Sequence, residues 1–312
     1  MEPGYTVPPP SRQLDIPFDA PGARKPCFTH VKVWGALPST VTPLVVLHGG
    51  PGASMDYCLS LVDVNTQTGR SVVMYDQIGN ARSTHLPEKK GDATFWTEAL
   101  WLAELQNVLH VLGIESNYAL WGSSWGGMLA ARHALLHPPG LKRLVLASAP
   151  SSIDRWLASA NRLRETLPLP ARQALEEGER TGQRDASEYQ KAMGDFFCTF
   201  GCRLRPMPKE VMASGQWSDK DNTVWETMNG DQGEFVNNGF LAGWSIVGQL
   251  GSIEVSTLVT NGEHDEAQDD VIMPYVDEIK GARWVKFKNS SHMAHFEERD
   301  EYMRVVIEFL EL

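Results

Sequence analysis

Two adjacent serines stand between glycines in the segment GSSWGG, residues 122–127. An apolar run ends just before this segment, and MLAARHALLH, which favours a helix, follows it. The spacing Gly-x-Ser-x-Gly fits in only one register, in which Ser124 lies between Gly122 and Gly126. A serine at a tight strand-to-helix turn needs small neighbours, and the first N–H groups of the helix stay free to bind negative charge. The pattern therefore predicts that Ser124 is a nucleophile.

A serine hydroxyl requires a base to accept its proton, and the base requires a group that orients it. Two later segments supply both, each directly after an expected strand: VTNGEHDEA contains Asp265, and VKFKNSSHMAHFEE contains His292. Because the loops after parallel strands lie at the same edge of a sheet, we expect Ser124, Asp265 and His292 to meet there. The chain order Ser, Asp, His is the one found in α/β-hydrolases.

Neighbouring residues compete for the roles of acid and base. Glu263 shares the loop of Asp265, and His264 and His295 are alternatives to His292. His292 is favoured because it follows the expected strand and two small serines, whereas His295 lies nearer the next helix. Asp265 is favoured over Glu263.

Attack by a serine produces an oxyanion, which requires two backbone N–H donors. Trp125, the residue after the nucleophile, is expected to provide one of them. The second is assigned to Gly50 in the loop HGGPG, residues 48–52, which follows an apolar strand. Its glycines let the backbone approach a substrate, and Pro51 stiffens the loop. The phosphate-binding patterns GxxxxGK[ST] and GxGxxG are both absent from the sequence.

The elements that must position these residues alternate between strands and helices. Short apolar runs that end in turn residues, such as PLVVLHGG and SVVMYDQIG, are typical of buried parallel strands. Helical spacing follows at 95–112 and after Ser124, and again at 270–280 and 298–311. This alternation predicts an α/β fold with a mostly parallel central sheet covered by helices.

The alternation breaks between residues 151 and 245. This segment contains prolines, polar helical stretches and four of the ten tryptophans, and it has no strand-like run. It is interpreted as a mostly helical cap, in which most of these tryptophans (Trp156, Trp217, Trp225 and Trp244) pack between cap and core. The expected organisation is a first part of the core at 1–150, the cap at 151–245 and a second part of the core at 246–312.

Charge and apolar content exclude several classes of partner. The chain has 28 lysines and arginines against 39 acidic residues, a net charge of −11, without a basic cluster, so neither nucleic acid nor an anionic membrane surface is an expected partner. The start, MEPGYTVPPPSRQLD, does not resemble a secretory signal, and no apolar run approaches the ~20 residues of a membrane span. A cytoplasmic location is therefore expected.

No metal or cofactor is expected. Cys198 and Cys202 lack a second pair that would complete a metal site, so the four cysteines are interpreted as free thiols. His133 and His137 stand one helical turn apart, but no HExxH pattern surrounds them.

The motifs HGGPG, DQIGNARS, GSSWGG, GEHDE and SSHMAHFEE occur in this order from about residue 28 onward. Together they resemble the proline iminopeptidase family of serine α/β-hydrolases and its tricorn-interacting aminopeptidase relatives. The resemblance implies an α/β-hydrolase fold with a helical cap, the triad Ser124, Asp265 and His292, and an oxyanion hole formed by Gly50 and Trp125. It also implies that Glu234 and Glu266 hold the free α-ammonium group of a substrate.

Three segments depart from the family pattern. NGDQGEF lacks the usual proline and has an additional residue before Glu234, Ala81 replaces a glycine, and LAGWS carries Gly243 and Ser245 where relatives often have aspartates. These positions shape the substrate pocket and leave the triad intact.

The sequence thus predicts a cofactor-free serine hydrolase that cleaves small amides or the N-terminal residue of short peptides through an acyl-enzyme. An alternative is hydrolysis of an ester, lactone or thioester of a specialised metabolite. Another is a protein that binds a ligand in this pocket without turnover. The sequence leaves the oligomeric state undetermined.

Overall fold

The computed structural model of the chain describes residues 6–312, and its centre is an eight-stranded sheet with the strand order β1-β2-β4-β3-β5-β6-β7-β8. The strands from β4 to β8 pair in parallel, whereas β1 and β2 are antiparallel additions at one edge. The predicted α/β fold with a mostly parallel sheet is confirmed. The strands are Arg12–Phe18 (β1), Cys27–Trp34 (β2), Leu44–Leu47 (β3), Val72–Asp76 (β4), Tyr118–Ser123 (β5), Leu141–Ala147 (β6), Thr257–Gly262 (β7) and Arg283–Phe287 (β8).

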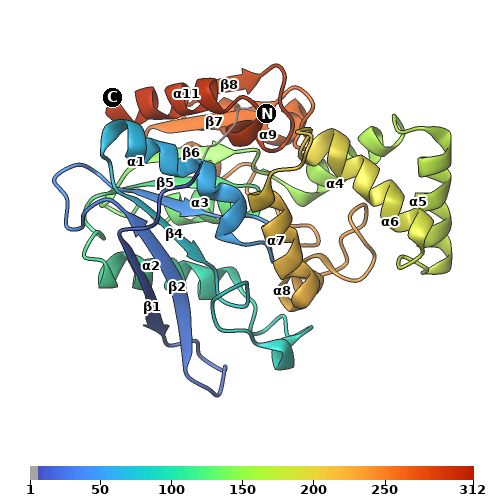
Figure 1. Cartoon of the computed structure of the whole chain (residues 1–312), viewed down its shortest axis with the longest axis horizontal. Coiled ribbons are helices and arrows are strands. Elements are labelled where there is room, and N and C mark those ends of the chain that lie inside the picture. Colours follow the sequence, from blue (N-terminus) through green and yellow to red (C-terminus); the bar gives the residue numbers. More distant parts are fainter. Residues whose placement is uncertain (1–5) are drawn as a thin grey trace.

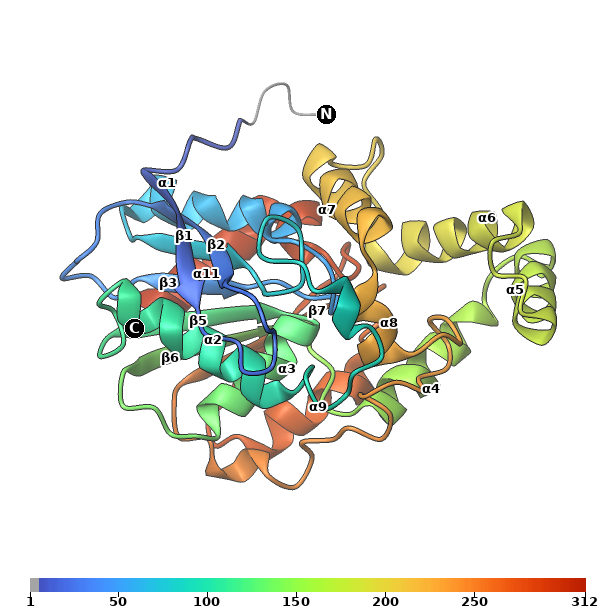
Figure 2. The same ribbon diagram turned by 90° about the horizontal axis from the view of Figure 1, so that it is seen from below.

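Helices cover both faces of the sheet (Figures 1 and 2). Two apolar cores result, one on each face, so that β3 and β4 are buried along their whole length. This explains why these strands read as continuous apolar runs instead of alternating patterns. Val62–Thr68 (α1) and Arg299–Glu311 (α11) cover one face, and Glu98–Val111 (α2), Trp125–Ala134 (α3) and Asp269–Glu278 (α9) cover the other.

The segment between β6 and β7 is helical, and α5 and α6 project beyond the sheet in both views (Figures 1 and 2). It has a small apolar core of its own around Leu175, Phe196 and Phe235. Its two ends meet, because Ser152 and Ser245 form an antiparallel bridge. The division into core and cap at 151 and 245 stays a prediction. The helices are Ile153–Arg164 (α4), Leu169–Thr181 (α5), Ser187–Phe196 (α6), Lys209–Lys220 (α7) and Thr223–Asn229 (α8).

The remaining helical elements are short and lie between the strands and helices named above. One of them, η1, leads from the HGGPG loop into α1, and another, α10, follows the loop that contains His292. They are Met55–Leu61 (η1), Pro87–Lys89 (η2), Phe197–Gly201 (η3), Leu250–Ser252 (η4) and Ala294–Glu297 (α10).

Strand β1 was not among the expected strands. Its sequence RQLDIPF contains a proline, and its first half is exposed, so it lacks the apolar signature of a buried strand. It lies at the edge of the sheet, where a proline is tolerated, and pairs with β2 from Arg12 opposite Val33 to Phe18 opposite Cys27. The strands and helices that the sequence predicted are all present, and the observed helix ends differ from the predicted ones by up to three residues.

The first five residues, on which part of the interpretation of the chain start rests, lie outside the described residues. None of the helices in 6–312 combines the length and the apolar composition that crossing a membrane requires.

Candidate active site

Ser124 lies at the sharp turn between β5 and α3. Its backbone is at φ 54° and ψ −122°, a strained conformation that non-glycine residues rarely adopt. A Cβ atom at Gly122 would come within 2.5 Å of the Gly126 carbonyl carbon, and one at Gly126 within 2.6 Å of the His48 carbonyl oxygen. The two glycines therefore let this turn pack against the end of β3, which fixes the position of the serine.

Asp265 follows β7, and His292 lies in the loop after β8. The Nδ1 atom of His292 is 2.7 Å from Oδ1 of Asp265. Asp265 is fully buried, and its carboxylate also accepts hydrogen bonds from the backbone N–H groups of Ala267 (2.8 Å) and Gly262 (3.3 Å). These donors hold the carboxylate in place, so that it can orient the imidazole. His292 and Ser124 line the same cavity.

The structure does not bring the competing residues to this cavity. Nδ1 of His295 lies 2.8 Å from Oγ of Ser60, and its ring packs among aromatic side chains under the loop. Glu263 is half exposed and pairs with Lys286 at 2.8 Å. His264 is not among the residues that line the cavity.

Carboxylates surround His292 on the side of Nδ1. Oε1 of Glu266 lies 3.8 Å from this nitrogen, and Glu234, from the loop after α8, lines the same cavity. Burial opposes protonation of His292, but the charges of Asp265, Glu266 and Glu234 outweigh it and raise the pKa of His292 to about 9. Burial raises the pKa values of Glu234 and Glu266 as well, and the charge of Glu266 adds to the shift at Glu234.

Gly50, in the HGGPG loop, and Trp125, at the start of α3, lie beside Ser124. The N–H of Gly49 donates to the hydroxyl of Tyr57 at 2.5 Å, and Gly50 turns the chain with φ 115°. Gly50, Trp125 and Ser124 line one small cavity. The amide of Gly49 is therefore occupied, and the assignment of Gly50 as a donor to the oxyanion stays a prediction.

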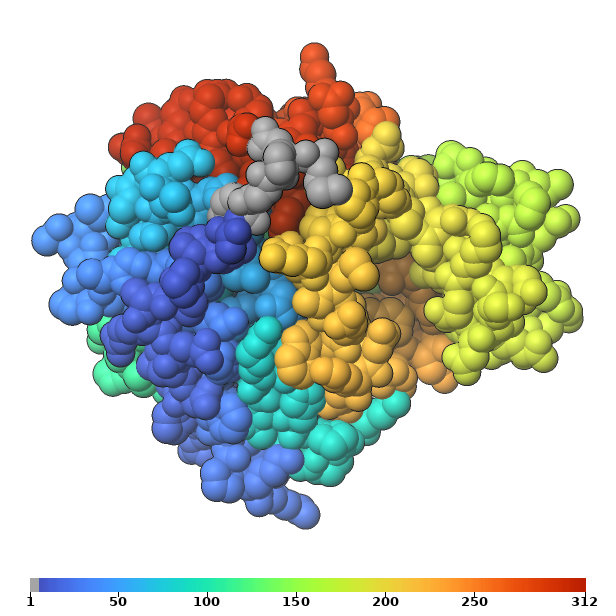
Figure 3. Space-filling model, in the orientation of Figure 1, coloured from blue at the N-terminus to red at the C-terminus, as the bar shows by residue number. Residues whose placement is uncertain are grey.

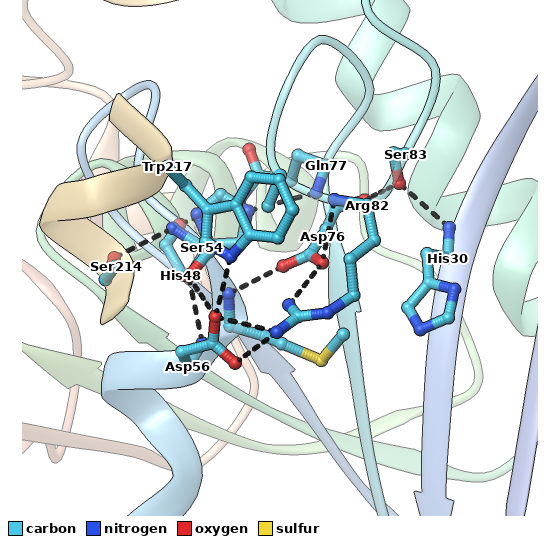
Figure 4. A network of polar contacts seen from close by, with 12 residues as sticks. His30, His48, Ser54, Asp56, Asp76, Gln77, Arg82, Ser83, Ser214 and Trp217 are labelled. Atoms are coloured by element: carbon cyan, nitrogen blue, oxygen red, sulfur yellow. Dashed lines mark hydrogen bonds and ion pairs between the residues drawn. The ribbon is translucent and has the colours of Figure 1, made fainter. Parts of the chain in front are cut away.

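A network of ion pairs among Asp56, Asp76 and Arg82 lies next to this loop and supports it (Figure 4). Oδ1 of Asp76, at the end of β4, accepts from the N–H of Met55 at 2.9 Å, and Oδ2 accepts from Nη1 of Arg82 at 3.0 Å. Nη2 of Arg82 donates to both carboxylate oxygens of Asp56, at 2.9 and 3.0 Å. Asp76 is fully buried and Asp56 nearly so, which makes Arg82 the counter-charge for both.

Gln77 connects the two proposed oxyanion segments. Its N–H donates to Nε2 of His48 at 3.0 Å, and its side-chain amide donates to the carbonyl oxygen of His48 at 2.7 Å. Nε1 of Trp125 donates to Oε1 of Gln77 at 2.9 Å. One side chain thereby fixes the HGGPG loop relative to the start of α3.

Helix α7 is attached to the same loop (Figure 4). Nε1 of Trp217 donates to Oδ2 of Asp56 at 3.2 Å, and the guanidinium of Arg82 stacks on the Trp217 ring, 5.3 Å from its centroid. The N–H of Ser54 donates to Oγ of Ser214 at 3.1 Å. Trp244, near the end of 151–245, similarly donates to Glu98 at 2.5 Å. These two tryptophans join the helical segment to the core, as expected, whereas Trp156 and Trp225 line cavities.

Sequence reasoning missed Arg82, Asp56 and Tyr57 as supports of the site. DQIGNARS contributed to the family resemblance, but its spacing carries no signal that Arg82 pairs with a residue 26 positions earlier. Tyr57 follows the HGGPG loop closely in sequence, and this proximity is the only signal that could have found it.

The described residues 6–312 contain no group of three or more histidine, cysteine, aspartate or glutamate side chains arranged to hold a metal ion. His133 is buried and hydrogen-bonded to the hydroxyl of Tyr118 at 2.6 Å. All four cysteines are free thiols; Cys198 is partly exposed, and Cys27, Cys58 and Cys202 are buried.

Comparisons with known proteins agree with this geometry. The model of the alpha/beta hydrolase fold family matches residues 42–299. Proline iminopeptidase of Thermoplasma volcanium is 34% identical over 86% of this chain and 88% of its own length, and that of Saccharolobus solfataricus is 36% identical over 86% and 84%. The crystal structure of VinJ has a TM-score of 0.91 and 42% identity over 97% of this chain and 99% of its own. The crystal structure of proline iminopeptidase from Mycobacterium smegmatis has a TM-score of 0.86 and 37% identity over 96% and 98%.

The ion network predicts that Arg82 positions the HGGPG loop. Replacing Arg82 with Met leaves Asp56 and Asp76 without their counter-charge. Because Arg82 is partly exposed, we expect a loss of about 2 kcal/mol in the free energy of unfolding. We also expect kcat to fall by about 10- to 100-fold with little change in KM, since a displaced oxyanion donor weakens transition-state binding.

The measurements are urea unfolding and steady-state kinetics, with Arg82→Lys as the conservative variant. Arg304→Met is the matched control, because Arg304 forms only exposed pairs with Glu301 and Glu308. A normal kcat in folded Arg82→Met would contradict the positioning role, and so would a failure of lysine to restore any of it.

The charge arrangement also predicts the pH dependence of Ser124 reactivity. With His292 as the predicted base, only its neutral form can accept the serine proton, so we expect the rate of inactivation by phenylmethylsulfonyl fluoride, which carries no amine, to rise with pH toward the pKa of about 9. Glu266→Gln removes a charge that favours the imidazolium, so the curve shifts to lower pH, with about tenfold faster inactivation at pH 7 for each unit of pKa lost. Glu263→Gln, in the same loop but paired with Lys286, should leave the curve in place. A shift to higher pH in Glu266→Gln would contradict the arrangement.

Proposed function

Because the chain belongs to the proline iminopeptidase family of α/β-hydrolases, we propose that it hydrolyses small amides with a free N-terminal amino group, with Ser124 as nucleophile, His292 as base and Asp265 as its orienting acid. The observation that carries this proposal is one cavity, lined by Ser124 and His292 together with the partly buried carboxylates of Glu234 and Glu266. A carboxylate pair of this kind can hold an ammonium group beside the nucleophile.

The reaction follows from these positions. Nε2 of His292 takes the hydroxyl proton while Oγ of Ser124 bonds to the carbonyl carbon. The N–H groups of Gly50 and Trp125 stabilise the oxyanion. The carbon–nitrogen bond then breaks, and the imidazolium gives its proton to the departing amine. Water, deprotonated by the same imidazole, attacks the acyl-enzyme, which releases the free amino acid and restores the serine.

The amine subsite links substrate charge to the base. Glu266 and Glu234 favour the protonated form of His292 in the empty site, as their charges raise its pKa. An ammonium group between the two carboxylates neutralises that influence and so favours the neutral imidazole that catalysis requires. Selection of a free amine thus rests on binding and on activation of the base together.

A second candidate function keeps the same triad and acts on an ester, lactone or thioester. The apolar character of the larger cavity, whose wall carries Met193, Phe197 and Met207, favours it, because such a wall accepts leaving groups other than peptides. We further propose a small-molecule or short-peptide substrate and a cytoplasmic location; the free cysteines support the latter.

The first test asks which of the two adjacent serines acts. Ser124→Ala should lower kcat for an aminoacyl p-nitroanilide by a factor of about 10³ to 10⁶, as removal of a triad nucleophile does. Ser123→Ala is the matched control; its hydroxyl is buried outside the cavity lining, and activity should stay within about tenfold of the parent. Full activity in Ser124→Ala would end the assignment.

The second test concerns the free amine. We expect kcat/KM for alanyl p-nitroanilide to exceed that for its N-acetyl counterpart by at least about 100-fold, because the blocked substrate covers two partly buried carboxylates without supplying a cation. Glu234→Gln should reduce this ratio at least about tenfold. Asp231→Asn, an exposed change in the same loop, should preserve it. A clear preference for the acetylated amide or for an aryl ester would favour the second candidate function instead.

A further inference from the structure

The cavity beside Ser124 is much larger than an ammonium site requires. It has a volume of about 430 Å³, within the range of about 300–1,000 Å³ that is usual for small-molecule sites. Apart from the catalytic groups, most of its wall comes from α6, η3 and α7. Most side chains on this wall, together with Met207 just before α7, are apolar: Met193, Phe196, Phe197, Met207, Val211 and Met212; the polar ones are Ser214 and Ser218.

Two compartments meet at the nucleophile. A second cavity of about 30 Å³ shares Ser124, Gly50 and Glu234 with the large one, and it is lined by Trp125 but not by His292. The large cavity is lined by Ser124 and His292. Because the departing group takes its proton from His292, it must lie on the side that this histidine faces. The large apolar compartment therefore receives the leaving group, and the small one lies beside the acyl carbonyl.

The described lining of the leaving-group compartment has no lysine or arginine that could pair with a carboxylate. Among the described residues that line it, the ionisable groups are Glu234, Glu266, His292 and Tyr57, and none is a lysine or arginine. The two glutamates would repel an anion, and the apolar wall would desolvate it without compensation. A dipeptide or tripeptide, which ends in a carboxylate, is thus a poor match for this wall.

The apolar wall continues to the surface. Phe197 and Met212 line the cavity and are nevertheless 38% and 53% exposed. In the space-filling view the surface is hollowed between α6 and α7, the helices that carry most of this wall (Figure 3). A chain that enters from Ser124 can therefore extend along apolar side chains toward solvent.

We propose that the preferred substrate is the amide of a small amino acid with a long apolar amine that carries no carboxylate, and that this amine occupies the compartment between α6 and α7. The proposal rests on the proposed aminoacyl-amide hydrolysis and specifies its leaving group. The bond that breaks is the amide bond; the products are the free amino acid and the apolar amine, which leaves with the proton from His292.

The direct test compares leaving groups on the unaltered enzyme. Alanyl n-alkylamides from butyl to decyl are compared with alanyl-alanine, with release of alanine as the readout. We expect kcat/KM to rise with chain length by up to about fourfold per methylene until the compartment is filled, and to exceed that for alanyl-alanine at least about 100-fold with the octyl chain. Equal rates for all chain lengths, or faster hydrolysis of alanyl-alanine, would overturn the proposal.

A charge introduced into the wall tests the location. Met212→Lys is on the half-exposed rim, where lysine fits without burial of its charge. We expect kcat/KM for alanyl octylamide to fall about tenfold and that for alanyl-alanine to rise several-fold, since the carboxylate gains a partner. Gln216→Lys, the same change in charge at an exposed position of α7 outside the cavity lining, should change neither. Equal effects of both lysines would overturn the assignment of this wall.

These outcomes distinguish failure of the apolar leaving group from failure of the proposed aminoacyl-amide hydrolysis. If the enzyme hydrolyses alanyl amides without regard to the amine, the proposed function stands and the apolar leaving group is wrong. If no alanyl amide is hydrolysed while a fluorophosphonate still labels Ser124, the proposed function fails and this inference fails with it.

Discussion

The close packing of the turn between β5 and α3 against the end of β3 is the constraint on which the site depends. Gly122 and Gly126 have no room for a side chain, and this packing holds Ser124 at a positive φ with its helix directly behind it. The same turn brings Trp125 next to the HGGPG loop, where Gln77 connects the two segments. The strained backbone of Ser124 is thus maintained by contacts among β5, β3, the end of β4 and the HGGPG loop.

The proposed selectivity for a free amine rests on charge. The buried carboxylate of Asp265 and the partly buried ones of Glu266 and Glu234 act on a single imidazole, and the described cavity lining contributes no lysine or arginine. Such a set of charges favours a cation in the cavity. The ion network beside the HGGPG loop has the opposite balance of charge, because there one guanidinium, of Arg82, pairs with two buried carboxylates. The carboxylates around His292 are proposed to bind the ammonium group of a substrate, whereas Arg82, Asp56 and Asp76 pair with one another and support the loop and α7.

The sequence was most informative where function depends on local spacing. The run of apolar strands predicted the sheet. Because Asp265 and His292 each lie in a loop after an expected parallel strand, their meeting at one edge of the sheet could be predicted as well. Strand β1 was missed because an edge strand with Pro17 has no buried periodicity. The contacts of Arg82, Asp56 and Trp217 could not be predicted, since they join segments up to 161 residues apart and depend on how α7 returns over the sheet. The apolar wall of the large cavity was missed for the same reason, as its residues come from separate segments of the chain.

The most direct measurement of the account is a crystal structure of the enzyme inactivated by the diphenyl ester of 1-aminoethylphosphonate, an analogue of an alanyl acyl-enzyme. The account predicts a phosphorus bond to Oγ of Ser124, a phosphonyl oxygen within about 3 Å of the N–H groups of Gly50 and Trp125, and the ammonium between Glu234 and Glu266. An adduct on another residue, or one on Ser124 whose phosphonyl oxygen points away from both amides, would contradict it.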